Sequence, residues 1–172
     1  HPSDLGATYQ ATAVEKKVRD ILRLPVGDRP TTQPVTQRRE PNNYEWQTRH
    51  RDILKHIEQN PPKAVIIGNS ITHFWGGEPA GPRSSGAKSW KKIMEPAGFL
   101  NLGYGYDRIE NVLWRIYHGE LDGYEADKVV LMIGTNNMGI SPDKDIVEGL
   151  RFLITAIRNR QPKATVKVIG IL

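Results

Sequence analysis

Short apolar runs alternate with amphipathic stretches from residue 63 onward, and this alternation is the feature that most constrains the fold. Between the runs, apolar residues recur at helical spacing over 109–116 and 146–157. Continuous apolar runs of strand length are typical of parallel strands buried on both faces. Alternation of such strands with helices predicts right-handed βαβ crossovers and a parallel sheet with helices on both sides. The strand-sized runs are 63–68, 99–103, 128–134 and 165–172.

Length and composition exclude several classes of protein. The 172 residues suit one domain, and no run approaches the ~18 apolar residues that a membrane-spanning helix needs. The chain has no cysteine, which excludes disulfide frameworks, thiolate nucleophiles and zinc-thiolate sites. The net charge of +5 is spread over interleaved charges of both signs, as in 120–128 and 143–148. We interpret this as a solvated surface and expect no nucleic-acid partner.

The first chemically suggestive motif follows the first predicted strand and reads Gly68-Asn69-Ser70-Ile71-Thr72. In a doubly wound sheet, ligands bind beyond the carboxyl ends of the strands. Ser70 would open a helix there, where unpaired N–H groups favour developing negative charge, as a nucleophilic serine requires. The simpler interpretation is that Ser70 only caps the helix. The G-x-S-x-G elbow of α/β-hydrolases is absent.

Two further motifs end the next two strands. An asparagine in Gly134-Thr135-Asn136-Asn137 can donate an N–H to an oxyanion, although such a turn also forms without any catalytic role. The stretch 101–108, Asn-Leu-Gly-Tyr-Gly-Tyr-Asp-Arg, is not a dinucleotide fingerprint, because Arg108 stands where the third glycine belongs. Its glycines let the backbone approach the edge of the sheet, with the amide around Gly105-Tyr106 free to donate.

Together, the three motifs resemble blocks I, II and III of the SGNH (GDSL-like) hydrolases. The stretch 110–137 is similar to the platelet-activating-factor acetylhydrolase type within that family, and the resemblance covers about 61–172. It implies a three-layer, flavodoxin-like α/β sandwich with a parallel sheet. It also implies that a serine attacks an ester carbonyl while an oxyanion hole holds the developing charge.

By position, the resemblance makes Ser70 the nucleophile. It assigns the oxyanion hole to the Ser70 amide, the Asn136 side chain and the backbone of Gly103–Tyr106, with the Tyr106 amide as the block II donor. Tyr106 stands where the family has glycine, and Asn69 where it usually has aspartate. A tyrosine at this position serves only if its backbone angles suit a residue with a Cβ. We also expect Tyr106 to fill part of the acyl site and to favour a small acyl group such as acetyl.

The general base is the incomplete part of this assignment. Family members carry their Asp and His in a D-x-x-H block after a fifth strand, and the chain ends at the fourth. His73 lies on the same short helix as Ser70, and surface roles are expected for the other helical histidines, His50, His56 and His118. His1, followed by Pro2 and an amphipathic stretch, resembles the block V histidine and the helix after it. His1 is therefore the candidate catalytic histidine, against the alternative of a chance or tag-derived terminus.

These resemblances divide the chain into three parts. Residues 1–24 resemble the C-terminal helix of an SGNH domain, 25–41 form a linker or surface strap, and 42–172 form an SGNH domain lacking its last strand. The chain is then a segment joining tandem domains, a permuted domain, or part of a longer protein. We expect it to be a poor esterase by itself.

The expected function is hydrolysis of a carboxylic ester, with an O-acetyl group on carbohydrate or on a small lipid as substrate. Carbohydrate is favoured because no long apolar channel is evident and because Trp75, Tyr104 and Tyr106 could stack on sugar rings. The alternative is a catalytically weak module that binds carbohydrate or protein. The resemblance implies no metal or organic cofactor, leaves a homo-oligomer open, and favours a secreted or periplasmic location.

Overall fold

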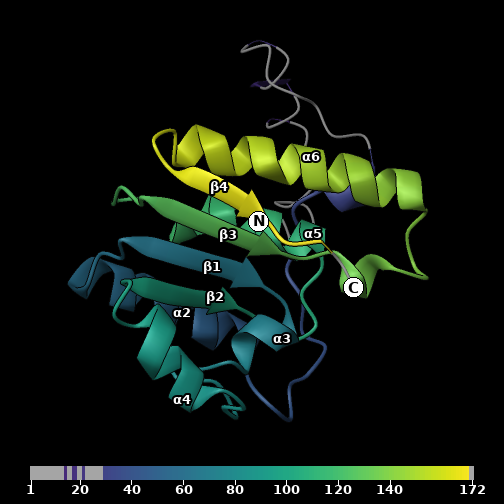
Figure 1. Ribbon diagram of the computed structural model, residues 1–172. Coiled ribbons are helices and arrows are strands. Elements are labelled where there is room, and N and C mark those ends of the chain that lie inside the picture. Colours follow the sequence, from purple (N-terminus) through teal and green to yellow (C-terminus); the bar gives the residue numbers. More distant parts are fainter. Residues whose placement is uncertain (1–13, 15–16, 19–20, 22–28, 171–172) are drawn as a thin grey trace, which may run out of the picture.

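The computed structural model describes residues 14, 17, 18, 21 and 29–170, which include a four-stranded parallel sheet (Figure 1). The strands lie in the order β2-β1-β3-β4. Gly68 at the end of β1 pairs with Gly103 of β2 and with Met132 of β3, so these three strands end level with one another. The α/β class and the flavodoxin-like parallel sheet are confirmed. The strand bounds are β1 (Ala64–Gly68), β2 (Phe99–Gly103), β3 (Lys128–Met132) and β4 (Thr165–Val168).

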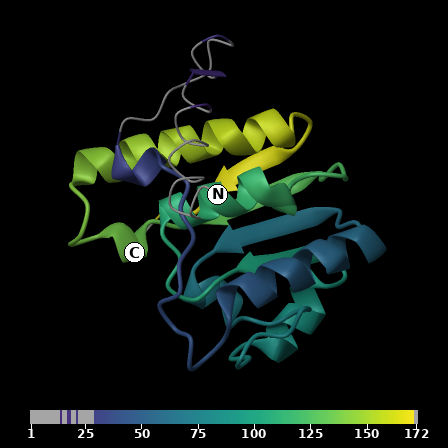
Figure 2. The same cartoon turned by 180° about the vertical axis from the view of Figure 1, so that it is seen from behind.

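Three helices cover one face of the sheet, seen from behind in Figure 2. They are α2 (Trp46–Gln59), α5 (Ile109–Arg115), which continues into the π-helical turn η3 (Ile116–Glu120), and α6 (Asp143–Arg160). Alternate strand residues such as Val65 and Ile67 point into this layer and are almost fully buried. The larger core therefore lies on this side, as the helical spacing of apolar residues predicts. Its fully buried side chains include Trp46, Ile53, Leu102, Ile109, Leu113, Leu131 and Leu153.

The opposite face is covered mainly over β1 and β2. The segment between these strands carries α3 (Ser70–His73), α4 (Ala87–Ser89) and the π-helical turn η2 (Trp90–Met94). Trp90 and Met94 pack on Ile66 to form a smaller cluster. The expectation that every strand is buried on both faces is wrong for β4, an edge strand whose Val168 is 50% exposed. Regular pairing there ends at Val168, short of the expected 165–172, and residues 171–172 lie outside the described part.

Residues 29–45, which we call the strap, run along the outside of the sheet's carboxyl edge. The strap begins with the 3-10 turn η1 (Pro30–Thr32), where Thr31 Oγ1 donates to the Asp145 carbonyl at 2.6 Å. Further on, the Val35 amide donates to the Glu110 carbonyl at 3.2 Å. The assignment of 25–41 as a linker or strap stays a prediction, but its described part contacts α5 and α6. No helix in the described part of the chain is long and apolar enough to cross a membrane.

Candidate active site

Ser70 begins α3 directly beyond the carboxyl end of β1. The preceding Asn69 is the N-cap, and its Oδ1 accepts a hydrogen bond from the Ile71 amide at 3.0 Å. Asn69, and not Ser70, therefore caps the helix, so capping does not explain the serine at this position. Ser70 is half-buried, and no hydrogen bond links its hydroxyl or its amide to another described residue. Both groups are available to a ligand at the edge of the sheet.

The loop from Gly103 to Arg108 follows β2 and lies beside α3. Its main-chain N–H groups are all paired except one. The Tyr106 N–H has no hydrogen-bond partner among the described residues. An unpaired donor beside an available serine suits an oxyanion. The other five amides donate to Asn101 Oδ1 (from Gly103), Gly68 O (Tyr104), His73 Nδ1 (Gly105), Tyr104 O (Asp107) and Asn111 Oδ1 (Arg108).

Gly103 does not fit the oxyanion role expected for it. Its amide donates to Asn101 Oδ1 at 2.8 Å, so that N–H is already occupied. A Cβ at this position would lie 2.3 Å from the His73 backbone nitrogen. Glycine is needed here because β2 and α3 approach each other closely, and we remove Gly103 from the candidate donors.

Tyr106 adopts the left-handed backbone conformation, with φ at 58°. This region costs a residue with a Cβ roughly 1–2 kcal/mol. Tyrosine therefore occupies a backbone position suited to glycine, and its N–H has no partner among the described residues. Its side chain is 51% exposed at the edge of the sheet, where it could contact a ligand.

Asn136 and Asn137 follow β3 in the 3-10 turn η4 (Thr135–Asn137) and have different environments. Asn136 is half-buried, and its Nδ2 donates to the Asp107 carbonyl at 2.9 Å. A side-chain amide has two N–H groups, so the second remains available. Asn137 is fully buried and holds the start of α5 by accepting from the Ile109 amide at 3.1 Å. The structure thus brings Ser70, Tyr106 and Asn136 to one edge of the sheet.

Comparison with known families identifies the family of this chain. The model of the GDSL-like lipase/acylhydrolase family matches residues 66–172, which is more than half of the chain. This chain belongs to the GDSL-like lipase/acylhydrolase family. The resemblance drawn from the three sequence motifs is confirmed.

Relatives of this GDSL-like chain include platelet-activating factor acetylhydrolase IB subunits. The alpha1 subunits of Bos taurus and Homo sapiens are each 27% identical over 145 residues, which cover 84% of this chain and 58% of theirs. The alpha2 subunit of Rattus norvegicus is 26% identical over 127 residues, covering 74% of this chain and 51% of that subunit. The chain therefore spans somewhat more than half the length of these relatives.

A solved structure from Streptococcus pneumonia, described as a platelet activating factor, shares the fold. The TM-score is 0.55 at 19% sequence identity, and the match covers 77% of this chain and 58% of that one. At this identity the likeness concerns the fold only.

No described histidine is placed to act as a base for Ser70 in this GDSL-like site. His1 lies outside the described residues, so its candidacy stays a prediction. His73 is buried, and its Nδ1 accepts a hydrogen bond from the Gly105 amide at 3.1 Å. Burial, with the nearby charges of Arg49 and Arg115, lowers the pKa of His73 to about 3. His73 therefore stays neutral and acts as a hydrogen-bond acceptor for the loop, not as a base for Ser70.

The surface role expected for His50 is wrong. His50 is 5% exposed on the inner side of α2, and its Nδ1 lies 2.9 Å from Glu120 Oε1. Glu120, interpreted above as part of a solvated charge run, is buried as well. His118 is exposed and His56 half-buried. A histidine and a carboxylate 70 residues apart leave no local signal of their pairing.

A buried ion network lies beneath the loop, and sequence reasoning missed it. Arg115 Nε donates to Asp107 Oδ2 at 2.9 Å, and Arg115 Nη1 is paired with Glu120 Oε2. Trp46 Nε1 donates to Asp107 Oδ1 at 2.7 Å. Burial raises the pKa of Asp107 to about 6 against the opposing effect of Arg115. Burial would also raise the pKa of Glu120, but Arg115 holds it below its ordinary value. Arg115 lies beside the apolar face of 109–116 and not on it, so no local pattern marks it as buried.

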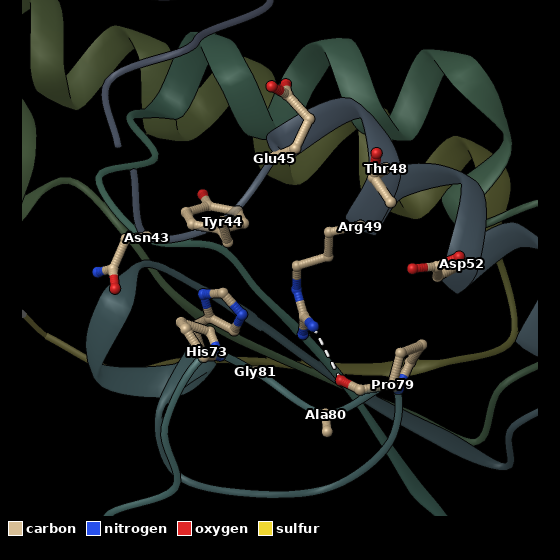
Figure 3. A pocket seen from close by; sticks show the side chains of 11 residues that line it. Asn43, Tyr44, Glu45, Thr48, Arg49, Asp52, His73, Pro79, Ala80 and Gly81 are labelled. Carbon is tan, nitrogen blue, oxygen red and sulfur yellow. Dashed lines mark hydrogen bonds between the residues drawn. The ribbon is translucent and has the colours of Figure 1, made fainter. Parts of the chain in front are cut away.

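Two pockets flank α3. The one beside Ser70 has a volume of about 530 Å³ and a mainly apolar lining. This is an open pocket, and the premise that no long apolar channel is evident stays a prediction. The other, shown in Figure 3, measures about 250 Å³ and has a mixed polar and apolar lining that includes Tyr44, Asp52 and His73. The described residues include no cluster of metal-ligating side chains. The apolar side chains beside Ser70 are Ile66, Ile71, Phe74, Trp75, Met132 and Ile169.

The sugar-stacking role expected for Tyr104 is wrong. Tyr104 is completely buried, and its hydroxyl donates to Glu120 Oε1. Trp75 is half-buried, packs against Trp90 and donates from Nε1 to Ser89 Oγ at 2.8 Å. Of the three aromatic residues, Tyr106 is the one with an exposed ring.

Proposed function

We propose that this protein is a serine ester hydrolase that works through an acyl-enzyme intermediate. The observation that carries the proposal is the pairing pattern of the block II loop. One amide, that of Tyr106, has no partner in the described part of the chain, and it lies at the edge of the sheet where Ser70 and Asn136 also lie. Family membership supports an acyl-transfer reaction at this edge.

In this proposal, Ser70 Oγ attacks the ester carbonyl carbon while its proton passes to a histidine. The carbonyl oxygen becomes an oxyanion that accepts hydrogen bonds from the amides of Ser70 and Tyr106 and from Asn136 Nδ2. The tetrahedral intermediate collapses, and the histidine returns the proton to the leaving alkoxide, which departs as the alcohol. Water, deprotonated by the same histidine, then hydrolyses the acyl-serine and releases the acid.

The histidine of this scheme is His1 or an equivalent residue outside the described part. A serine whose histidine or orienting acid is missing loses most of its rate. The chain alone is therefore expected to be a poor esterase.

For the substrate, we propose an ester with a small acyl group, such as acetyl, on a small lipid rather than on carbohydrate. The exposed Tyr106 ring would limit the length of the acyl group. The apolar pocket beside Ser70 would take the rest of the ester. The names of the acetylhydrolase relatives support the same class. The buried position of Tyr104 removes part of the argument for a carbohydrate.

A fluorophosphonate probe tests the proposal on the protein as its gene encodes it. We expect the probe to label Ser70, as located by peptide mass spectrometry, and labelling to be lost in Ser70→Ala. Ser85→Ala is the matched control, because Ser85 lines the same pocket but is not one of the proposed catalytic groups. Absence of labelling at Ser70 would contradict the proposal and favour the alternative, a binding module without catalysis.

A further inference from the structure

We infer that Gln37 and Tyr44 are positioning residues that aim the Tyr106 N–H at the proposed oxyanion site. The inference rests on the proposed function, and it adds two residues that come from the strap rather than from the three sequence motifs. Neither residue is expected to touch the substrate. They act through the peptide bond that joins Gly105 to Tyr106.

Both side chains donate to the same carbonyl oxygen. Tyr44 Oη donates to Gly105 O at 2.7 Å, and Gln37 Nε2 donates to it at 2.9 Å. A trans peptide is planar, with its C=O and N–H on opposite sides. The N–H of this peptide belongs to Tyr106. Fixing the Gly105 oxygen toward the strap therefore points the Tyr106 N–H away from the strap.

The left-handed backbone of Tyr106 explains why two hydrogen bonds to the Gly105 oxygen are needed. At φ 58° the residue is strained, and rotation of the Gly105–Tyr106 peptide would let it reach a negative φ. Such a rotation would also turn the N–H away from the substrate. It would break both hydrogen bonds to the Gly105 oxygen, so the strap opposes it. On the far side of the residue, Arg39 Nη1 donates to the Tyr106 oxygen at 3.0 Å.

Gln37 is buried, Tyr44 is half-buried, and both remain hydrogen-bond donors. Gln37 is 8% exposed, and its Nε2 also donates to Asp107 Oδ1 at 3.0 Å. The Tyr44 ring lies edge-on against His73, with the ring centroids 4.8 Å apart (Figure 3). Burial and the charge of Asp107 raise the pKa of Tyr44 above its ordinary value, so its hydroxyl remains a donor at all working pH values. The strap approaches so closely that a Cβ on Gly105 would lie 2.2 Å from Glu40 Oε2.

The decisive experiment is a double-mutant cycle between Tyr44→Phe and Tyr106→Gly. Tyr44→Phe removes one hydroxyl and keeps the ring. In the protein as its gene encodes it, with Tyr106 retained, we expect kcat for p-nitrophenyl acetate to fall roughly tenfold with little change in KM, because a misaimed oxyanion donor weakens only the transition state. In the Tyr106→Gly background the fall should be less than about threefold, because glycine has no strain to relieve by rotation.

The matched control is Tyr124→Phe, which removes a hydroxyl that donates to the Glu120 carbonyl at 2.9 Å and not to the Gly105 oxygen. It should lower Tm about as much as Tyr44→Phe and leave kcat unchanged. Equal loss of kcat in both backgrounds, or the same loss in Tyr124→Phe, would overturn the inference.

A second readout does not depend on catalysis. The Tyr106 amide resonance in ¹⁵N NMR should shift and exchange faster with solvent deuterium in Tyr44→Phe, and Gln37→Met should reproduce the change. If Ser70→Ala keeps full esterase activity, the proposed function fails, and the NMR result still decides whether Tyr44 orients this peptide. An unchanged Tyr106 amide in both strap variants would refute the positioning role.

Discussion

The side-chain amide of Asn136 donates a hydrogen bond to the main-chain oxygen of Asp107 at 2.9 Å. Asp107 directly follows Tyr106, so this bond fixes two proposed oxyanion donors relative to each other. Asn136→Ala removes one donor and loosens the other. We expect kcat to fall by about 10²–10³, the cost of removing an oxyanion donor in other serine hydrolases, with a small change in KM. Steady-state kinetics with p-nitrophenyl acetate measure this.

The neighbouring Asn137 is the control for that variant. It is buried and bonded to the Ile109 amide and to Glu110 Oε2, so Asn137→Ala should lower the free energy of unfolding by about 1–3 kcal/mol. Denaturant titration of both variants separates the two asparagines. A larger stability loss in Asn136→Ala than in Asn137→Ala would contradict these assignments.

Tyr106→Gly should raise the stability of the fold, whereas removal of a side chain usually lowers it. It should also shift the acyl preference toward longer acyl groups. Glycine adopts φ 58° without strain, which favours the folded state by about 1 kcal/mol, although the flexible unfolded chain offsets part of this gain. Removal of the exposed ring should raise activity on butyryl esters relative to acetyl esters. Thermal unfolding and the acetyl-to-butyryl ratio of kcat/KM provide the measurements, and an unchanged ratio would rule out the acyl-limiting role.

His73 should make stability depend on pH. Its pKa is about 3 in the folded protein against an ordinary 6.5, so the unfolded chain binds more protons between these values. The free energy of unfolding should therefore fall on acidification from pH 6.5 toward 3, by at most about 1.4 kcal/mol per pH unit from this residue. His73→Asn keeps an acceptor for the Gly105 amide but does not titrate. Urea unfolding at several pH values should show a shallower dependence in this variant, and identical slopes would argue against a neutral His73.

Glu120→Gln should be strongly destabilising because both carboxylate oxygens accept from buried donors. Oε1 faces His50 and Tyr104 while Oε2 faces Arg115, so the amide of a glutamine must point at a donor. Breaking a buried ion pair in this way costs about 3–5 kcal/mol. Glu125→Gln is the control, because the Glu125–Lys163 pair is exposed and should contribute little. Comparable effects of the two substitutions on denaturant midpoints would refute the role of the network.

The fold and the positions of the three motifs were predictable from the sequence. Apolar periodicity is a local property, and the runs at 63–68, 99–103 and 128–134 show it directly. Because parallel strands end at a common edge, the motifs that follow three strands had to meet there. This reasoning placed Ser70, Tyr106 and Asn136 at one edge. The exposure of β4 was not predictable, because burial depends on what lies across the sheet rather than on the strand itself.

Sequence by itself therefore determined the α/β architecture and the edge at which chemistry would occur. The tertiary structure decided which groups at that edge are free. Gly103 and Tyr106 lie three residues apart, yet one amide is occupied by Asn101 and the other has no partner among the described residues. Gln37 and Gly105, which are bonded, lie 68 residues apart. The packing of segments distant in the sequence determines which groups form hydrogen bonds, and this leaves no local pattern in the sequence.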